Sequence, residues 1–435
     1  PNRTKRCAPD SMNYRSIKNP AIQRSFVRAL REGLAPDRSL FVPEQIPSLE
    51  WESLKGCTLS ELAALMMKPL IGDAIERDEL EGLLREALNF EIPTVEVHED
   101  LSLLELFHGP TSAFKDVGAR VMSRLLGSTS QERLTVLVAT SGDTGSAVAQ
   151  GFFQVPGIDV VILYPSKRIS KIQEQQLTTV GENVVAIELE GTFDDCQALV
   201  KEAFLDESVQ IARPLTSANS INVGRWLPQS IYYAWATLEA GEPLDFVVPS
   251  GNFGNIAAGV LAQRMGMPVG SFCAAVNAND VMKTYMQTGL YQPSVSIPTI
   301  SNAMDVGDPS NRSRIEWLYN GAFDEMKSAF HVESVSEAST LQEMTSFWES
   351  TQQLVCPHTA VGIHAARQLK GKRKKVVLST AHPAKFGDVV RRATGQVATV
   401  PEQLKGCIEK EKVSILMPND YSVFRDYLLD SRKAR

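Results

Sequence analysis

The sequence lacks the features that would direct it to a membrane, to an oxidising compartment or to a metal ion. Its six cysteines include no C-x-x-C pair, so we expect reduced thiols in a cytoplasmic protein rather than a disulfide framework. Its six histidines show no H-E-x-x-H or comparable spacing, so we expect no metal site. No apolar run is long enough to cross a bilayer, and no apolar core of a signal peptide stands near residue 1. We therefore expect neither a membrane span nor a secretory leader.

A strong charge of either sign is also absent. The 44 basic and 51 acidic residues give a net charge of -7, which argues against nucleic acid or an anionic membrane as a partner. Hydrophobic residues make up 43% of the chain and charged residues 22%, as in ordinary globular proteins. A chain of 435 residues is longer than one hydrophobic core usually serves, so we expect two or three domains.

Apolar spacing separates the N-terminal part of the chain from the rest. Residues 1–11 carry basic side chains and no apolar pattern, so we expect either a disordered lead or an added segment that is not native, with Met12 as a plausible native start. Residues 12–93 are expected to form a mainly helical N-terminal domain. Apolar residues recur there about every 3.6 positions in three segments, residues 22–30, 59–70 and 78–88.

Beyond this domain the pattern changes to alternating strands and helices. Short apolar runs that predict strands are separated by segments that predict helices. This order is typical of parallel sheets covered by helices, and it assigns the chain to the α/β class. The expected strands are residues 101–106, 134–139, 159–164, 184–189, 246–249, 269–276 and 376–379.

One lysine, Lys115, stands in an unusual position, within the first turn of an expected helix. The positive end of the helix dipole disfavours its charged form, and its neighbours Ala113 and Phe114 suggest partial burial, which lowers the pKa of an amine further. A neutral amine is what Schiff-base chemistry with an aldehyde requires. The alternative is a surface lysine that happens to begin a helix.

Three more strand-to-helix junctions are suited to a polar ligand. Residues 250–255 are rich in glycine, so their backbone N–H groups can approach a phosphate, but they match neither G-x-G-x-x-G nor a Walker A loop. Residues 140–145 could receive a carboxylate or a phosphate, and a hydroxyl in residues 379–383 could face a ring nitrogen. Each junction also has a purely structural interpretation as a turn or a helix cap. Together with the lysine they describe a cofactor with one aldehyde and one phosphate, which pyridoxal 5'-phosphate satisfies.

The motifs at these junctions resemble those of the threonine synthase family, and they are nearest to its longer branch in bacteria and fungi. The matching segments follow the family's order between residues 12 and 388: residues 108–116 (HGPTSAFKD), 138–145 (VATSGDTG), 217–222 (SANSIN), 249–255 (PSGNFGN), 301–305 (SNAMD) and 380–386 (TAHPAKF). The resemblance implies the tryptophan-synthase-β-like fold, which is fold type II of pyridoxal-phosphate enzymes. It places residues 94–127 and 208–420 in a large cofactor-binding α/β domain and residues 128–207 in a small inserted α/β domain.

The same resemblance implies the site residues. Lys115 would carry the cofactor as a Schiff base and act as the catalytic residue, and Thr380 would face the pyridine nitrogen. The cofactor phosphate would be held by Gly251, Asn252, Phe253, Gly254 and Asn255. The candidates for binding the substrate are Ser141, Asp143, Thr144, Lys167, Lys171, Asn219, Asn222 and Arg225. Among these, Asp143 is expected to act indirectly, because one carboxylate binds another poorly.

The implied reaction is that of a carbon–oxygen lyase acting on a phosphate ester, EC 4.2.3.1. It converts O-phospho-L-homoserine and water to L-threonine and phosphate by elimination at Cγ and addition of water at Cβ. The alternative within the same fold is a phospholyase, or a serine/threonine dehydratase that releases 2-oxobutyrate. A metabolite-binding relative without activity would be expected to lack Lys115 or the glycine loop, and an oxidoreductase would need the absent dinucleotide fingerprint. We expect a monomer or a homodimer.

Overall fold

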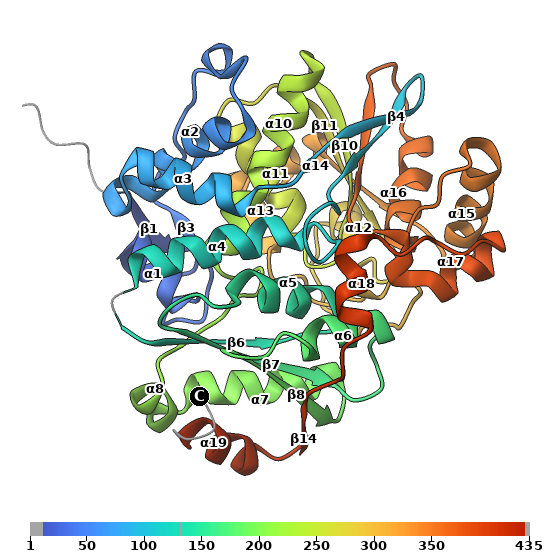
Figure 1. The fold of residues 1–435 in the computed structure, drawn as a ribbon. Helices are drawn as coiled ribbons and strands as arrows, with labels where there is room; N and C mark the ends of the chain where they lie inside the picture. The colour runs from blue at the N-terminus through green and yellow to red at the C-terminus, as the bar shows by residue number, and fades with distance from the viewer. Residues whose placement is uncertain (1–11, 131, 431–435) are drawn as a thin grey trace, which may run out of the picture.

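The computed structural model describes residues 12–130 and 132–430, so the lead expected at residues 1–11 lies outside the described part of the chain. Three sheets organise the fold (Figure 1). One small sheet lies in the N-terminal segment with the order β2-β1-β3, a six-stranded sheet has the order β12-β11-β10-β13-β5-β4, and a five-stranded sheet has the order β14-β8-β7-β6-β9.

The N-terminal segment contains helices and, in addition, a small antiparallel sheet that the sequence did not predict. It begins with three antiparallel strands, β1 (Asn13–Ser16), β2 (Gln23–Ser25) and β3 (Phe41–Pro43). The expected helix at residues 22–30 is split, because Ser25 accepts a hydrogen bond from the N–H of Arg28 and so caps a helix that begins only at Phe26. Strands of three or four residues are too short to leave an alternating pattern in the sequence. The helices here are α1 (Phe26–Glu32), α2 (Leu59–Ile71) and α3 (Arg77–Ala87).

The six-stranded sheet is parallel except for its edge strand β4. Alternate residues of β10 enter different cores: Phe246 and Val248 pack in the core that contains α11, whereas Val247 packs with α16 on the other face. Because both faces of these strands are buried, their sequences are continuous apolar runs. The elements are β4 (Thr94–His98), β5 (Leu101–Glu105), β10 (Leu244–Pro249), β11 (Val269–Val276), β12 (Phe330–Ser334), β13 (Lys375–Ser379), α4 (Lys115–Thr129), α11 (Gly254–Arg264) and α16 (Pro357–Gln368).

The five-stranded sheet is parallel throughout and lies between α5 and α6 on one face and α7 on the other (Figure 1). The predicted inserted unit, residues 128–207, supplies three of its strands. Two more come from outside that range, and the C-terminal helix α19 packs beside α7. The elements are β6 (Leu134–Ala139), β7 (Ile158–Pro165), β8 (Val184–Glu190), β9 (Leu215–Thr216), β14 (Ile415–Pro418), α5 (Asp143–Phe152), α6 (Lys171–Thr178), α7 (Phe193–Leu205) and α19 (Tyr421–Leu429).

The order of the larger sheet determines where a ligand can bind. Because β13 pairs in parallel with both β5 and β10, the carboxyl ends of these three strands are neighbours at one edge. Ligands of α/β proteins gather at such edges.

In the described part of the chain no helix is both long enough and apolar enough to cross a membrane.

Candidate active site

Three loops meet at the carboxyl edge of the larger sheet. The loop after β5 leads to Lys115, the loop after β10 is the glycine loop, and the loop after β13 contains Thr380. The N–H of Phe114 donates to the carbonyl of Thr380 at 2.9 Å, and the N–H of His382 donates to the carbonyl of Ser112 at 3.1 Å. These two main-chain bonds hold Thr380 directly beside the lysine segment.

Lys115 is the first residue of α4, as the sequence predicts. Its Nζ lies 4.8 Å from the centre of the Phe114 ring, and no hydrogen-bond or ion-pair partner for it exists among the described residues. Burial, the largest influence, lowers the pKa of the Lys115 amine; Asp143 opposes this shift, and the positive charges of Arg225 and Lys385 add to it. An unpaired amine with a lowered pKa is suited to react with an aldehyde.

The glycine loop has the close backbone approach that an anion site needs. Phe253 adopts the left-handed conformation with φ of 60° immediately before α11. A Cβ atom on Gly251 would lie 2.7 Å from the Cα of Met304, so this position cannot accept a side chain without moving the backbone. The first N–H groups of α11 have no partner within their own helix, and they carry the positive end of the helix dipole.

Two asparagines of the loop fix its shape and leave one donor free. Asn252 accepts from the N–H of Ser310 at 2.7 Å and donates to Ser220 at 2.7 Å. Asn255 Oδ1 accepts from the hydroxyls of Tyr232 and Tyr233 at 2.5 and 2.7 Å, whereas its Nδ2 is buried without an acceptor in the described chain. A buried donor without an acceptor is costly, and a phosphate at the start of α11 would satisfy it. The loop therefore fits the cofactor phosphate.

Thr380 is buried, and its hydroxyl has no hydrogen-bond partner among the described residues. The neighbouring Ser379 differs, since its Oγ lies 3.1 Å from Oγ1 of Thr359. A free hydroxyl at the end of the strand between Lys115 and the glycine loop fits the ring nitrogen of a cofactor held at both ends.

The turn before α5 has hydroxyl groups of two kinds, one that bonds within the turn and two that bond to no other described residue. Thr140 Oγ1 accepts from the N–H groups of Gly142 and Gly145 at 3.0 and 2.9 Å, so it shapes the turn. Ser141 and Thr144 are partly exposed, and their hydroxyls bond to no described residue. The turn can therefore offer two hydroxyls to an anion.

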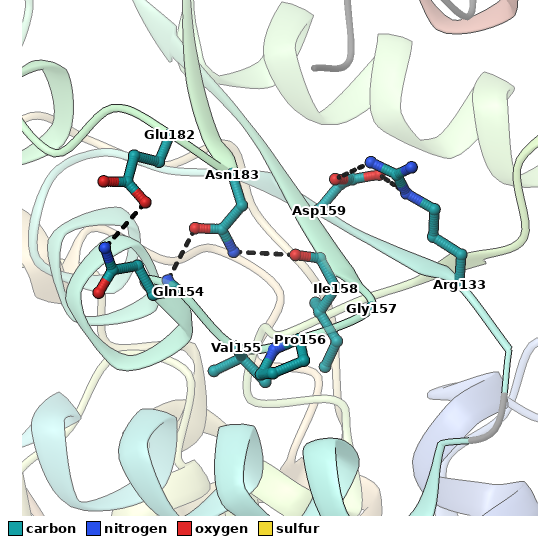
Figure 2. A pocket seen from close by; sticks show the side chains of 9 residues that line it. All are labelled: Arg133, Gln154, Val155, Pro156, Gly157, Ile158, Asp159, Glu182 and Asn183. Carbon is teal, nitrogen blue, oxygen red and sulfur yellow. Dashed lines mark hydrogen bonds and ion pairs between the residues drawn. The ribbon is translucent and has the colours of Figure 1, made fainter.

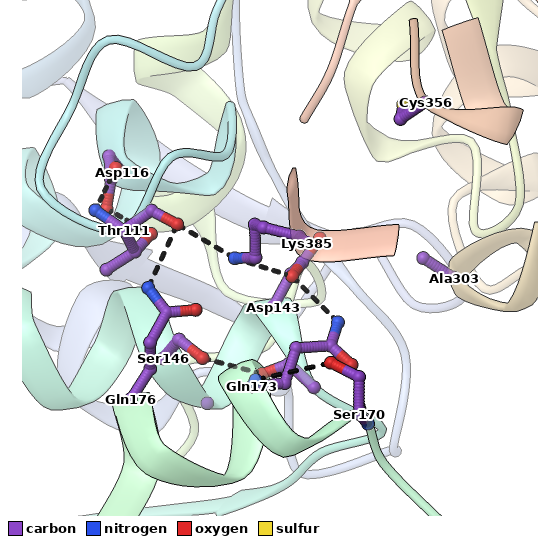
Figure 3. Close-up of polar contacts among 12 residues, drawn as sticks. Thr111, Asp116, Asp143, Ser146, Ser170, Gln173, Gln176, Ala303, Cys356 and Lys385 are labelled. Atoms are coloured by element: carbon purple, nitrogen blue, oxygen red, sulfur yellow. Dashed lines mark hydrogen bonds and ion pairs between the residues drawn. The ribbon is translucent and has the colours of Figure 1, made fainter. Parts of the chain in front are cut away.

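The structure adds Lys385, which sequence reasoning did not select. Its Nζ lies 2.8 Å from Oδ1 of Asp143, and the two side chains are 0% and 4% exposed. Figure 3 shows the pair between the loop that contains Thr111 and the helices of the smaller sheet. The only signal in the sequence is a charged residue within the apolar run Ala384–Phe386, and it does not reveal the partner.

The predicted substrate-phosphate residues occupy different environments. Arg225 is buried, donates to the carbonyl of Ala218, and its Nε has no acceptor among the described residues. Burial lowers the pKa of Arg225 to about 10 against the influence of Asp116, which leaves the side chain charged near neutral pH. Asn219 Oδ1 is also buried without a partner in the described chain. Both remain candidates to meet a ligand.

Asn222, by contrast, is committed to the fold. Its Nδ2 donates to the carbonyls of Leu30 and Ser217 at 2.8 and 2.9 Å, and its Oδ1 accepts from the N–H of Gly224 at 2.8 Å. This side chain therefore caps a short helix, and both ends of its amide bond to the protein, so we do not include it in the proposed substrate site.

Lys167 and Lys171 are exposed. Lys171 begins α6, from which Gln173 donates to Asp143 and Gln176 donates to the carbonyl of Thr111. A residue two positions before Gln173 projects from nearly the opposite side of a helix, so Lys171 points away from this contact. The structure does not bring either lysine to Lys115.

A separate surface hollow of about 510 Å³ lies at the amino end of β7 (Figure 2). Its polar side chains bond to one another: Arg133 pairs with Asp159 at 2.8 Å, and Gln154 donates to Glu182 at 2.9 Å. The hollow is therefore at the opposite edge of the smaller sheet from the turn before α5, and it is not part of the candidate site.

Comparison with known proteins agrees with this geometry. Residues 94–381 match the family model described as pyridoxal-phosphate dependent enzyme. Residues 13–88 match the model of the threonine synthase N terminus, and residues 359–428 match that of the threonine synthase C-terminal region.

Individual relatives match over nearly the whole chain. Threonine synthase of Haemophilus influenzae is 40% identical over 97% of this chain and 100% of its own length. The crystal structure of pyridoxal-phosphate-bound threonine synthase from Brucella melitensis is 33% identical and covers 98% of this chain and 100% of its own, with a TM-score of 0.93. The Escherichia coli enzyme structure is 38% identical and covers 96% and 100%, with a TM-score of 0.91. This chain therefore belongs to the threonine synthase family of pyridoxal-phosphate-dependent enzymes.

Proposed function

We propose that this chain converts O-phospho-L-homoserine and water to L-threonine and phosphate, with pyridoxal phosphate bound at the carboxyl edge of the larger sheet. One observation carries the proposal. Main-chain hydrogen bonds hold the segment of Lys115, whose amine is unpaired, beside Thr380 in the loop after β13, and the glycine loop follows β10, the neighbouring strand on the other side of β13. An aldehyde, a ring nitrogen and a phosphate can then each meet a suitable group of the protein.

Each cofactor contact has a separate physical basis. Lys115 Nζ would bind the aldehyde, the N–H groups of residues 251–255 together with Asn255 Nδ2 would bind the phosphate, and Thr380 Oγ1 would meet the ring nitrogen. Bound pyridoxal phosphate supplies an electron sink for negative charge that develops on the substrate. Thr380 carries no charge, so it orients the ring without fixing a full positive charge on the nitrogen as an aspartate would.

Lys115 also moves protons. With the cofactor and substrate bound, its Nζ would be placed to accept the proton from Cα, and burial, which lowers the pKa of this amine, favours the neutral form that can accept a proton. The same amine would be placed to carry protons at Cβ and Cγ while phosphate leaves Cγ and water adds at Cβ.

The substrate's own anionic groups need two further contacts. Ser141 and Thr144, with the N–H groups that begin α5, are placed to bind the carboxylate. Arg225 and Asn219 are the candidates for the phosphate, since both have a buried polar atom without a partner among the described residues.

Product analysis distinguishes this reaction from its nearest alternative. A phospholyase or a dehydratase shares the elimination step but releases 2-oxobutyrate and ammonia. We expect incubation with O-phospho-L-homoserine to yield threonine and phosphate in equal amounts, and 2-oxobutyrate as the main product would contradict the proposal. The five described cysteines are free thiols, which supports a reducing compartment such as the cytoplasm. A monomer or homodimer remains our prediction.

Arg225→Ala tests the substrate-phosphate contact. A charge-assisted hydrogen bond contributes roughly 1.5–3 kcal/mol, so we expect kcat/KM to fall about ten- to hundredfold while the cofactor stays bound. Inorganic phosphate should inhibit the variant less than it inhibits the wild type.

The matched control is Arg120→Ala, because Arg120 donates to the carbonyl of Ala87 at 2.7 Å, between helices. It should lower the melting temperature without changing phosphate inhibition, and the same behaviour in the Arg225 variant would assign Arg225 a structural role.

A further inference from the structure

The buried ion pair between Lys385 and Asp143 joins three separate parts of the chain. Asp143 begins α5 in the smaller sheet's unit, whereas Lys385 lies in the short helical turn η5 (Pro383–Phe386) that follows β13 of the larger sheet. Lys385 Nζ donates to the carbonyl of Thr111 at 2.8 Å as well as to Asp143. Thr111 stands four residues before Lys115 and belongs to its loop.

Helix α6 contacts Asp143 and also the main-chain carbonyl that Lys385 uses. Gln173 Nε2 donates to Asp143 Oδ1 at 2.9 Å, and Gln176 Nε2 donates at 3.1 Å to the same carbonyl of Thr111 that Lys385 uses. Figure 3 shows these donors converging on Asp143 and Thr111 from different elements. The pair therefore fastens α5 and α6 to the loop that carries the catalytic lysine.

The charge of Asp143 needs compensation at this place. A buried carboxylate next to Lys115 favours the protonated form of that amine, and it repels an anionic substrate at the neighbouring hydroxyls of Ser141 and Thr144. Burial alone would raise the pKa of Asp143, but Lys385 and then Lys115 hold it well below its ordinary value, so the group is ionised. Lys385 supplies the opposite charge within hydrogen-bonding distance.

No other titratable group described around Lys115 neutralises the negative charge of Asp143 in the way that Lys385 does. Burial lowers the pKa of His358 to about 4 and raises the pKa of the Cys356 thiol, so both are neutral near neutral pH. Asp116 is buried and accepts both bonds from Thr111, at 2.9 and 2.7 Å. Arg225 is positive and donates to a main-chain carbonyl, without an acidic partner among the described residues.

We propose that Lys385 is a positioning residue for the reaction, which neutralises Asp143 and ties α5 to the lysine loop. The turn before α5 can then bind the substrate carboxylate, and Lys115 can give up its proton. This role rests on the proposed function. Asp143 accordingly acts through Lys385 and the turn rather than by touching the substrate.

Charge substitutions in the loaded enzyme test the proposal by the sign of their effects. The readout is the pH midpoint at which the absorbance of the bound cofactor changes, which reports protonation at the Lys115 nitrogen. Lys385→Met leaves Asp143 uncompensated and should raise the midpoint, whereas Asp143→Asn leaves Lys385 uncompensated and should lower it. We expect each shift to be about one pH unit, a tenfold change in proton affinity. The double variant should lie nearer the wild type than either single variant.

Substrate binding gives a second readout. We expect KM for O-phospho-L-homoserine to rise at least about tenfold in Lys385→Met, because an uncompensated carboxylate repels an anion, and to recover in the double variant. The matched control is Lys375→Met, since Lys375 forms a 2.8 Å pair with Asp100 at the amino end of β13, whereas Lys385 follows the carboxyl end of that strand. It should leave the midpoint and KM unchanged.

Shifts of the same sign in both single variants, or no shift in folded and loaded protein, would overturn the proposal. If Lys385→Met fails to fold, the double variant is compared with Asp143→Asn instead. The proposal then requires that the double variant has a higher pH midpoint than Asp143→Asn alone. A wild-type protein that binds the cofactor but makes no threonine would overturn the proposed reaction, and the midpoint shifts would still decide the role of Lys385.

Discussion

Replacement of Lys115 by alanine should reduce threonine formation by at least about a thousandfold, because the variant loses both the anchor of the cofactor and the amine that moves protons. The melting temperature of the cofactor-free protein should change little. Lys115 Nζ makes no hydrogen bond or ion pair with any described residue, so its removal breaks none. A coupled assay for phosphate and threonine, with a thermal melt on the same preparation, measures both effects.

The control for this variant is Lys201→Ala, an exposed lysine on α7. Surface substitutions of this kind change stability by about 0.5 kcal/mol or less, and Lys201 lies outside the site, so activity should be retained. Wild-type activity in Lys115→Ala would remove Lys115 from the chemistry and with it the whole assignment of the site.

Replacement of Gly254 by valine should release the cofactor. A Cβ atom at this position would lie 3.2 Å from both Ser220 Cβ and Asn311 Nδ2, so the methyl groups of valine would crowd the residues that hold the loop. Asn311 Nδ2 donates to the carbonyl of Asn252 at 3.0 Å, and a displaced loop would lose its N–H contacts to phosphate. We expect the cofactor dissociation constant to rise roughly ten- to hundredfold, the loss of one or two charge-assisted bonds.

Gly82→Val is the matched control, because Gly82 lies within helix α3 and a Cβ there meets nothing within 4 Å. It should bind the cofactor as the wild type does. Titration of the two cofactor-free variants with pyridoxal phosphate, followed by absorbance, compares them directly. If Gly254→Val binds as tightly as the wild type, the cofactor phosphate is held by another part of the chain.

The sequence predicts the larger sheet and the junctions at its edge well, for a physical reason. Strands buried on both faces form continuous apolar runs, so the predicted strand at residues 269–276 coincides with β11 of the larger sheet, and that at residues 134–139 coincides with β6 of the smaller sheet. The turn residues at the ends of such strands then lie together at one edge. For this reason Lys115 and Thr380 could be assigned to one site before their contact was known.

Features that depend on distant contacts were not predictable in this way. The edge strand β14 is mostly exposed and pairs with β8, more than 200 residues earlier in the chain, so no local pattern identifies it. Asn222 resembles a ligand-binding residue in sequence, but its amide bonds to Leu30 in the N-terminal segment. Lys385 gives no sign that its partner is Asp143, because only the folded chain brings them together.

Borohydride reduction of the purified, cofactor-loaded protein, followed by digestion and mass spectrometry of the peptides, tests the central claim most directly. Reduction makes the bond between the cofactor and its lysine permanent, and the modified residue can then be located. We expect to find the pyridoxyl group on Lys115, with Lys385 unmodified. Modification of Lys385 instead, or of no lysine in a protein that forms threonine, would contradict the assignment of Lys115.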